Sequence, residues 1–231
     1  MNGDAKICRL MILALAFFVA ACSERVPQNS AEPASAPKMI PLKLELPPYG
    51  ACHLPRIVSA PNLESKLNCL GLDVMIPEDA TNIALRKPVT SSEKFPLLGG
   101  IEMVTDGAKE GHKYVELSGG LQWVQIDFEK QCEIYAVALW HWFEPYHAYR
   151  DVVVQVSDDP EFKKGIATIF NNDHDNSSGL GLGTEKAWEP TYNGKVIVPS
   201  EPVKARYIRF YSNGSDYVET NAYCEVEVYG R

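Results

Sequence analysis

The clearest pattern along the chain is a series of short segments in which apolar and polar side chains alternate. In residues 152–157, Val152, Val154 and Val156 would share one face and the residues between them the other, as in a half-buried strand. The same two-residue period recurs over residues 123–128, 205–211 and 224–230. Gly-Gly and Asn-Gly pairs separate such segments, and no helical period of useful length occurs. The pattern predicts an all-β domain of antiparallel strands.

The N-terminal part of the chain has a different composition. Two basic residues precede an apolar run that ends at Ala21 and is too short to span a bilayer comfortably, so residues 1–21 are predicted to be an export signal. The sequence 19–22, Val-Ala-Ala-Cys, resembles the bacterial lipobox, which implies that Cys22 is lipidated. An ordinary secretory signal cleaved nearby is the alternative. Proline-rich residues 22–48 are predicted to form an extended tether.

These features predict a lipid-anchored protein of the bacterial cell envelope. The residue after Cys22 is not Asp, which by resemblance to enterobacterial sorting rules is compatible with the outer membrane. The formal net charge of −8 argues against nucleic acid and against electrostatic docking on anionic lipid. Membrane contact is therefore expected only through the N-terminal lipid.

The chain after Cys22 holds four cysteines, an even number that in an exported protein predicts two disulfides. Three pairings are possible. We favour Cys52–Cys69, which would close a local loop in the N-terminal segment 49–79. We also favour Cys132–Cys224, because both side chains share parity with apolar strand neighbours and would face the core. A zinc site that uses His53 or His112 is a weaker alternative, since no CxxC pair is present.

Several motifs in the second part of the chain resemble, in order, those of the discoidin, or coagulation factor V/VIII type C, family. They are Asn82–Thr90, the Asp-Gly turn in Val104–Gly107, Gln122–Asp127, Arg150–Asp159, Ala205–Arg209 and Glu225–Gly230. The resemblance covers residues 80–231. It implies an eight-stranded antiparallel jelly-roll β-sandwich of the galactose-binding-like class.

The resemblance also implies a structural calcium ion. Many family members hold calcium between the Asp-Gly turn and a Glu at the start of the last strand, and Asp106 and Glu225 match these positions. The carbonyl groups implied as further ligands belong to Met103, Ala108, Gly111 and Cys224. Such a set suits a hard cation, which needs several oxygens at short range. Ala108 stands where Asn or Asp is common. The alternative is that Asp106 only caps the turn and Glu225 is a surface residue.

Family members bind ligands through loops at one end of the barrel. A sugar offers an apolar face for stacking and hydroxyl groups for polar contacts, so its site needs aromatic and polar side chains together. Two loops offer this mixture, with candidate ligand-binding residues Trp142, Glu144, Tyr146, His147 and Arg150 in one and Asp216, Tyr217 and Asn221 in the other. Arg150 could instead form a salt bridge with Asp151 or Glu144.

A long polar, glycine-rich loop over residues 171–183 is a third feature. It could bind a metal through Asp173, His174 and Asp175, act as a specificity loop, or be a surface loop held by Asx turns.

No motif of a nucleophile with a base, a metalloprotease or a phosphate loop is present, so we expect a non-catalytic protein. The sequence predicts a lipoprotein that binds carbohydrate, a polysaccharide or glycoconjugate, with calcium bracing the loops. The alternative is an interaction module for a protein partner in an envelope complex, which a contiguous exposed apolar patch would favour.

Overall fold

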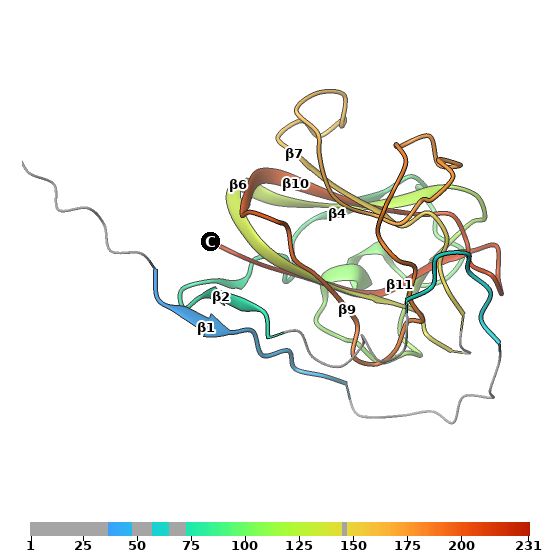
Figure 1. Ribbon diagram of the computed structural model, residues 1–231, viewed down its shortest axis with the longest axis horizontal. Helices are drawn as coiled ribbons and strands as arrows, with labels where there is room; N and C mark the ends of the chain where they lie inside the picture. Colours follow the sequence, from blue (N-terminus) through green and yellow to red (C-terminus); the bar gives the residue numbers. More distant parts are fainter. Residues whose placement is uncertain (1–36, 48–56, 65–72, 145–146) are drawn as a thin grey trace, which may run out of the picture. The chain divides into compact units, whose positions relative to one another are not determined.

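The computed structural model describes residues 37–47, 57–64, 73–144 and 147–231 (Figure 1). The predicted export signal, Cys22, Cys52, Cys69 and Tyr146 lie outside these ranges. The regular secondary structure of the described part is almost entirely β-strand, with one 3-10 helix, η2 (Ile101–Thr105). Within the same ranges, no helix has the length and apolarity needed to cross a bilayer.

The strands form two sheets, and every pairing between them is antiparallel. The small sheet contains β1 (Met39–Pro41) and β2 (Met75–Pro77). The main sheet contains nine strands: β3 (Thr81–Asn82), β4 (Val89–Ser91), β5 (Val115–Leu117), β6 (Gln122–His141), β7 (Val153–Ser157), β8 (Ala167–Asn171), β9 (Lys195–Ile197), β10 (Val203–Ser212) and β11 (Asn221–Gly230).

The long strand β6 belongs to both layers of a sandwich (Figure 1). Its first part pairs with β10 and β4, as in Ile126 opposite Ile208 and Val89. Its last part pairs with β11 and β9, as in Val137 opposite Val228 and Ile197. Because β6 passes from one layer to the other, the nine strands are hydrogen-bonded into one sheet. This arrangement confirms the predicted antiparallel β-sandwich, with one strand more than the eight expected.

The main core lies between the two layers. Val152, Val154 and Val156 are all buried in it, which confirms the face predicted from the alternation. The expectation of a half-buried strand is wrong, because Val153, Gln155 and Ser157 on the opposite face are buried too. The three core valines meet Phe210 of β10 and Val226 of β11, so the core joins residues far apart in sequence. Burial of each such side chain contributes about 1.5–3 kcal/mol to the stability of the fold.

The predicted disulfide between Cys132 and Cys224 is wrong. Both residues are free, buried thiols, and they lie in different apolar clusters. Cys224 falls at a register shift of β11, between Tyr223 and Glu225, so the parity of the later valines does not extend to it. It packs against Trp140, which is eight positions along β6 from Cys132. At about 3.3 Å per residue, this separation is far beyond the reach of a disulfide.

The boundary predicted for the tether is also wrong, because residues 37–47 pack on the folded domain. β1 pairs with β2, and Ile40 and Leu42 pack with Val74, Ile76 and Ala136 in a second cluster. A third cluster contains Ala138, Trp140 and Cys224, and Leu44 packs against it. The outer face of the layer formed by β6, β9 and β11 is therefore covered by the N-terminal segment, which is part of the domain and not a spacer.

Candidate ligand and cation sites

A row of aromatic rings lies where β6 ends and its following loop begins. Trp142, directly after β6, is 5.6 Å from Tyr114 and 5.4 Å from His147, measured between ring centroids. His147 is in turn 6.4 Å from Tyr217, in the loop before β11. His147 is fully buried, whereas Tyr217 is 50% exposed at the end of the row. Two loops separated by about 70 residues in sequence thus present one aromatic surface.

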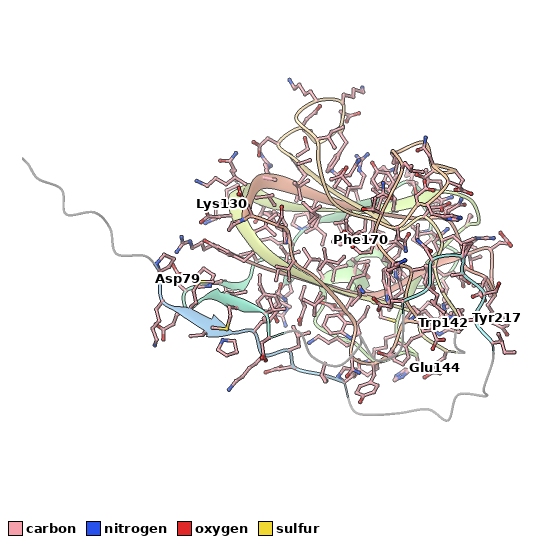
Figure 2. The ribbon with its side chains drawn as sticks, viewed as in Figure 1. Asp79, Lys130, Trp142, Glu144, Phe170 and Tyr217 are labelled. Carbon is pink, nitrogen blue, oxygen red and sulfur yellow. The ribbon has the colours of Figure 1, made fainter. Side chains whose placement is uncertain are left out.

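The candidate residues Trp142, Glu144 and Tyr217 lie at the same end of the barrel (Figure 2). Glu144 lies close to Gly111, where an added Cβ would be 2.8 Å from Phe143 and 3.2 Å from the Glu144 carboxylate. Gly111 is therefore required for this close approach of the two loops. The structure brings three of the predicted ligand-binding side chains, Trp142, His147 and Tyr217, into one row.

Other predicted ligand-binding residues hold the loops together instead of facing solvent. Asn221 is fully buried and accepts a hydrogen bond from Gly214 N while donating to the carbonyls of Ser118 and Gly120. Its amide group satisfies loop backbone that would otherwise be buried without partners. This role explains the choice of Asn and leaves the side chain no surface for a ligand.

Arg150 is half exposed and is paired with neither Asp151 nor Glu144, the two partners considered from the sequence. Its guanidinium lies 2.7 Å from Glu219 and donates to Asn213 O at 3.1 Å. The Arg150 and Glu219 side chains are 45% and 80% exposed, so the pair contributes at most about 1 kcal/mol to stability. Both charged groups remain accessible beside the Tyr217 loop.

The turn predicted to bind calcium meets the last strand as the sequence implies. Gly107 N donates to the Glu225 carboxylate at 3.0 Å, and Asp106 accepts from Ala108 N at 2.7 Å. Glu225 is fully buried, and its Oε1 has no hydrogen-bond partner among the described residues. Burial, together with the charge of Asp106, raises the pKa of Glu225 to about 9. The alternative that Glu225 is a surface residue is therefore wrong.

Glu110 joins this acidic environment and was missed in the sequence. Its Oε2 is a second buried carboxylate oxygen without a hydrogen-bond partner in the described part of the chain. Burial first, and then the carboxylates of Glu144, Glu225 and Glu110, raise the pKa of the Cys224 thiol. Glu225 therefore keeps one buried carboxylate oxygen without a hydrogen bond beside the Asp106–Gly107 turn, and carboxylate oxygens are ligands that suit a hard cation. The carbonyl ligands at Met103, Ala108, Gly111 and Cys224 stay a prediction.

The polar loop at residues 171–183 contains a different acidic group from the one predicted. Carboxylate oxygens of Asp151, Asp173 and Asp175 lie within 4.8 Å of one another, and His174 is not part of the group. Asp173 accepts hydrogen bonds from Ser177 N and from the backbone and hydroxyl of Ser178. Asn171 and Asp175 each accept a hydrogen bond from the backbone N–H two residues on, at Asp173 and Ser177. These are Asx turns, which agrees with the plainest of the three interpretations.

The chain was compared with protein families, curated proteins and solved structures, and only solved structures match it. No protein-family model and no curated protein matches the chain. A chitosan-binding module of a chitosanase/glucanase from Paenibacillus sp. IK-5 is 19% identical, with a TM-score of 0.48, over 65% of this chain and 99% of that one. The family 32 carbohydrate-binding module of C. perfringens NanJ, in complex with galactose, is 10% identical, with a TM-score of 0.48, over 65% and 97%.

A fucolectin from striped bass (Morone saxatilis) serum is 17% identical, with a TM-score of 0.45, over 66% of this chain and 49% of that one. All three identities lie below 25% and all three TM-scores below 0.5. The ligand proposals below therefore rest on the geometry of this chain. The chain itself is an antiparallel β-sandwich, with aromatic and acidic groups at one end.

Proposed function

We propose that this protein binds carbohydrate, without catalysis, at the end of the barrel where Trp142, His147 and Tyr217 lie. The observation that carries the proposal is the aromatic row, which ends in a half-exposed tyrosine. An aromatic ring can stack on the apolar face of a sugar, and buried neighbouring rings hold it in place before the ligand arrives. Arg150 and Glu219 lie beside this loop and can exchange hydrogen bonds with sugar hydroxyls.

The test is a glycan array probed with residues 22–231, the chain without its predicted export signal. Galactose, chitotriose and 4,5-unsaturated mannuronic acid are included because solved structures of similar fold contain them. Tyr217→Ala should weaken binding to the best glycan at least tenfold, because stacking contributes about 1–2 kcal/mol. Tyr217→Phe should retain most of the affinity, since it keeps the ring.

Phe95→Ala is the matched control. Phe95 is an exposed aromatic residue, 78% accessible, in the loop before η2. Its loss should leave the affinity unchanged. Equal weakening by both alanine variants, or no binding to any glycan by folded protein, would contradict the proposal.

We further propose that a calcium ion braces this end of the barrel, held by Asp106 and Glu225 together with the carbonyls of Met103, Ala108, Gly111 and Cys224. The support is the buried, unpartnered oxygen of Glu225 beside the Asp106–Gly107 turn. The ion would neutralise the carboxylates and tie the turn to β11. Glu110, which lies 3.5 Å from Lys113, also raises the pKa of the Cys224 thiol, the residue before Glu225 in the chain.

Calcium should raise the thermal midpoint of the parent protein but not that of Glu225→Gln. At a concentration 100 times the dissociation constant, binding to the folded state alone stabilises by about 2.7 kcal/mol. For a domain of this size, the midpoint should rise by roughly 5–10 °C in differential scanning calorimetry. Magnesium is the control ion, because its strict octahedral geometry suits this set of carbonyls poorly. A calcium shift of equal size in Glu225→Gln would place the ion elsewhere.

A second candidate function is docking of a protein partner in an envelope complex. The observation in its favour is an exposed apolar run in the loop before η2, where Phe95, Leu97 and Leu98 are 78%, 60% and 50% accessible. Backbone contacts of Leu97 and Leu98 with Glu116 fix this run against β5. The location proposed for either function is the bacterial envelope, with a lipid on Cys22.

A further inference from the structure

Residues 57–64, here called the strap, cross the loops at the ligand end of the barrel (Figure 1, cyan). The sequence shows no period in this stretch, and no role was predicted for it. The strap makes hydrogen bonds to the loop between β8 and β9 and to the loop between β10 and β11. It is thus placed where it can act on the aromatic row from outside the jelly roll.

The contact nearest the aromatic row is with Asp216. Ser59 N donates to Asp216 Oδ2 at 2.8 Å, and Ala148 N donates to Asp216 Oδ1 at 2.9 Å. Asp216 N returns a hydrogen bond to Ala148 O at 3.1 Å. Both carboxylate oxygens are therefore used inside the protein, and Asp216 joins the Tyr217 loop, the His147 loop and the strap at one point.

The rest of the strap is fixed to the neighbouring loop over residues 171–187. The amide of Asn62 donates to Asn172 O and Glu185 O, and Leu63 pairs with Ala187 in a parallel bridge. Glu64 N donates to Ala187 O. The strap is therefore held along its length and does not rest on the Ser59 contact alone.

A partly buried ion pair holds the end of the strap. The Glu64 carboxylate lies 2.7 Å from Lys195 Nζ, with side chains 13% and 20% exposed. Lys195 Nζ also lies 5.4 Å from the centre of the Trp188 ring. Because this end is anchored to β9, the Ser59 amide presents a fixed donor to Asp216.

We propose that Asp216 and the Ser59 amide are positioning groups, which hold Tyr217 in register with His147 and Trp142 for the ligand. This inference rests on the proposed carbohydrate function. It assigns Asp216 a role through Tyr217 and not contact with the ligand. The affinity of the site then depends on a segment outside the jelly roll.

The test removes the donor without changing the ligand-facing side chains. Ser59→Pro lacks the backbone N–H, whereas the matched control Ser59→Ala keeps it. Ser59→Pro should weaken binding of the best array glycan about tenfold, because a hydrogen bond to a charged acceptor is lost at the point that orients Tyr217. Ser59→Ala should bind as the parent does. Dissociation constants are measured well below the unfolding midpoint of each variant, so that a loss of stability alone does not change them.

Asp216→Asn probes the other side of the same contact. Its amide can accept one of the two backbone hydrogen bonds but meets the second N–H with a donor, so it should weaken glycan binding to a similar degree. If the strap acts through Asp216, the double variant Ser59→Pro/Asp216→Asn should lose little more affinity than either single variant. Additive losses would show two independent effects and would overturn the inference.

Hydrogen exchange gives a readout that needs no glycan. Ser59→Pro should speed exchange at the amides of Ala148 and Asp216, and Ser59→Ala should not. Unchanged exchange and unchanged affinity in Ser59→Pro would overturn the positioning role, even if the parent binds glycan. Faster exchange in Ser59→Pro, together with no glycan binding by the parent, would overturn the proposed function and with it the ligand part of this inference.

Discussion

Lys109→Met should lower the free energy of unfolding by about 3–5 kcal/mol, as measured by urea titration of residues 22–231. Lys109 Nζ lies 2.7 Å from Glu227 Oε1, and both side chains are only 8% exposed. The same ammonium donates to Glu45 O and lies 5.2 Å from the centre of the Trp140 ring. Removing it leaves the Glu227 carboxylate buried without its countercharge, which is the costly way to break such a pair.

Two further variants distinguish loss of the buried countercharge from loss of any lysine. Lys163→Met removes a lysine whose pair with Glu161 is 77% and 69% exposed, and it should cost less than about 0.5 kcal/mol. The double variant Lys109→Met/Glu227→Gln removes the buried charge as well, so it should recover most of the loss. A cost below about 1 kcal/mol for Lys109→Met alone would show that water reaches Glu227.

Acid should destabilise the protein through His141, the last residue of β6. The ring is fully buried, stacks on Tyr149 at 4.2 Å and lies 4.6 Å from Tyr223, and neither nitrogen has a hydrogen-bond partner in the described residues. Burial, with a smaller effect of His147, lowers the pKa of His141 to about 3. The unfolded chain takes up a proton near pH 6.5, whereas the folded protein does so only near pH 3.

This difference in pKa makes the folded protein less stable at lower pH. The contribution of neutral His141 to stability is fully present above pH 6.5 and is lost as the pH falls toward 3. The loss is about 1.4 kcal/mol per pH unit, so roughly 2–3 kcal/mol should disappear between pH 6.5 and 4.5. The measurement is the free energy of unfolding at several pH values in parent and His141→Phe, a variant that keeps a planar ring and does not titrate.

Carboxylates titrate in both proteins, so their effect cancels when the free energy of unfolding of the parent is subtracted from that of His141→Phe. The difference should grow in favour of the variant by about 2–3 kcal/mol over this range. A pH-independent difference for His141→Phe would mean that the ring is protonated in the fold or reaches water.

The strands could be predicted from sequence because side chains alternate between the two faces of a strand. Val152, Val154 and Val156 follow that period and lie in the main core, although the opposite face of β7 is buried too. The period fails at Cys224, where a register shift turns the chain by one position and moves the thiol to another cluster. A bulge of this kind depends on the partner strand and leaves no mark in the local pattern.

The N-terminal cover was missed for a related reason. Pro41 in β1 suggested an extended spacer, but β1 pairs only with β2, and proline is tolerated in an edge strand. Leu42 and Leu44 are too few to show a period, and what they bury against lies about 30 to 180 residues away. Composition alone therefore gave the wrong boundary.

At the site, residue type was a better guide for aromatic than for polar side chains. Trp142, His147 and Tyr217, proposed from residue type as ligand contacts, lie in one row, because large rings in loops bury their area against each other. Asp216 and Asn221 were expected to face a ligand, but they bind backbone amides and carbonyls within the loops. The Ala148 N–H that Asp216 accepts from is 68 positions away in sequence. The sequence around Asp216 therefore gives no sign that its carboxylate is needed by a backbone amide.

The covered face of β6, β9 and β11 has a consequence for how this domain can be used. A jelly roll cut at residue 80, the boundary drawn from the family motifs, would lose β1, β2, Leu42 and Leu44. Ala136, Ala138, Trp140 and Cys224 would then form an apolar, thiol-bearing surface in water, which favours aggregation. Fusion and truncation variants of this domain should therefore begin near residue 37 and not at residue 80.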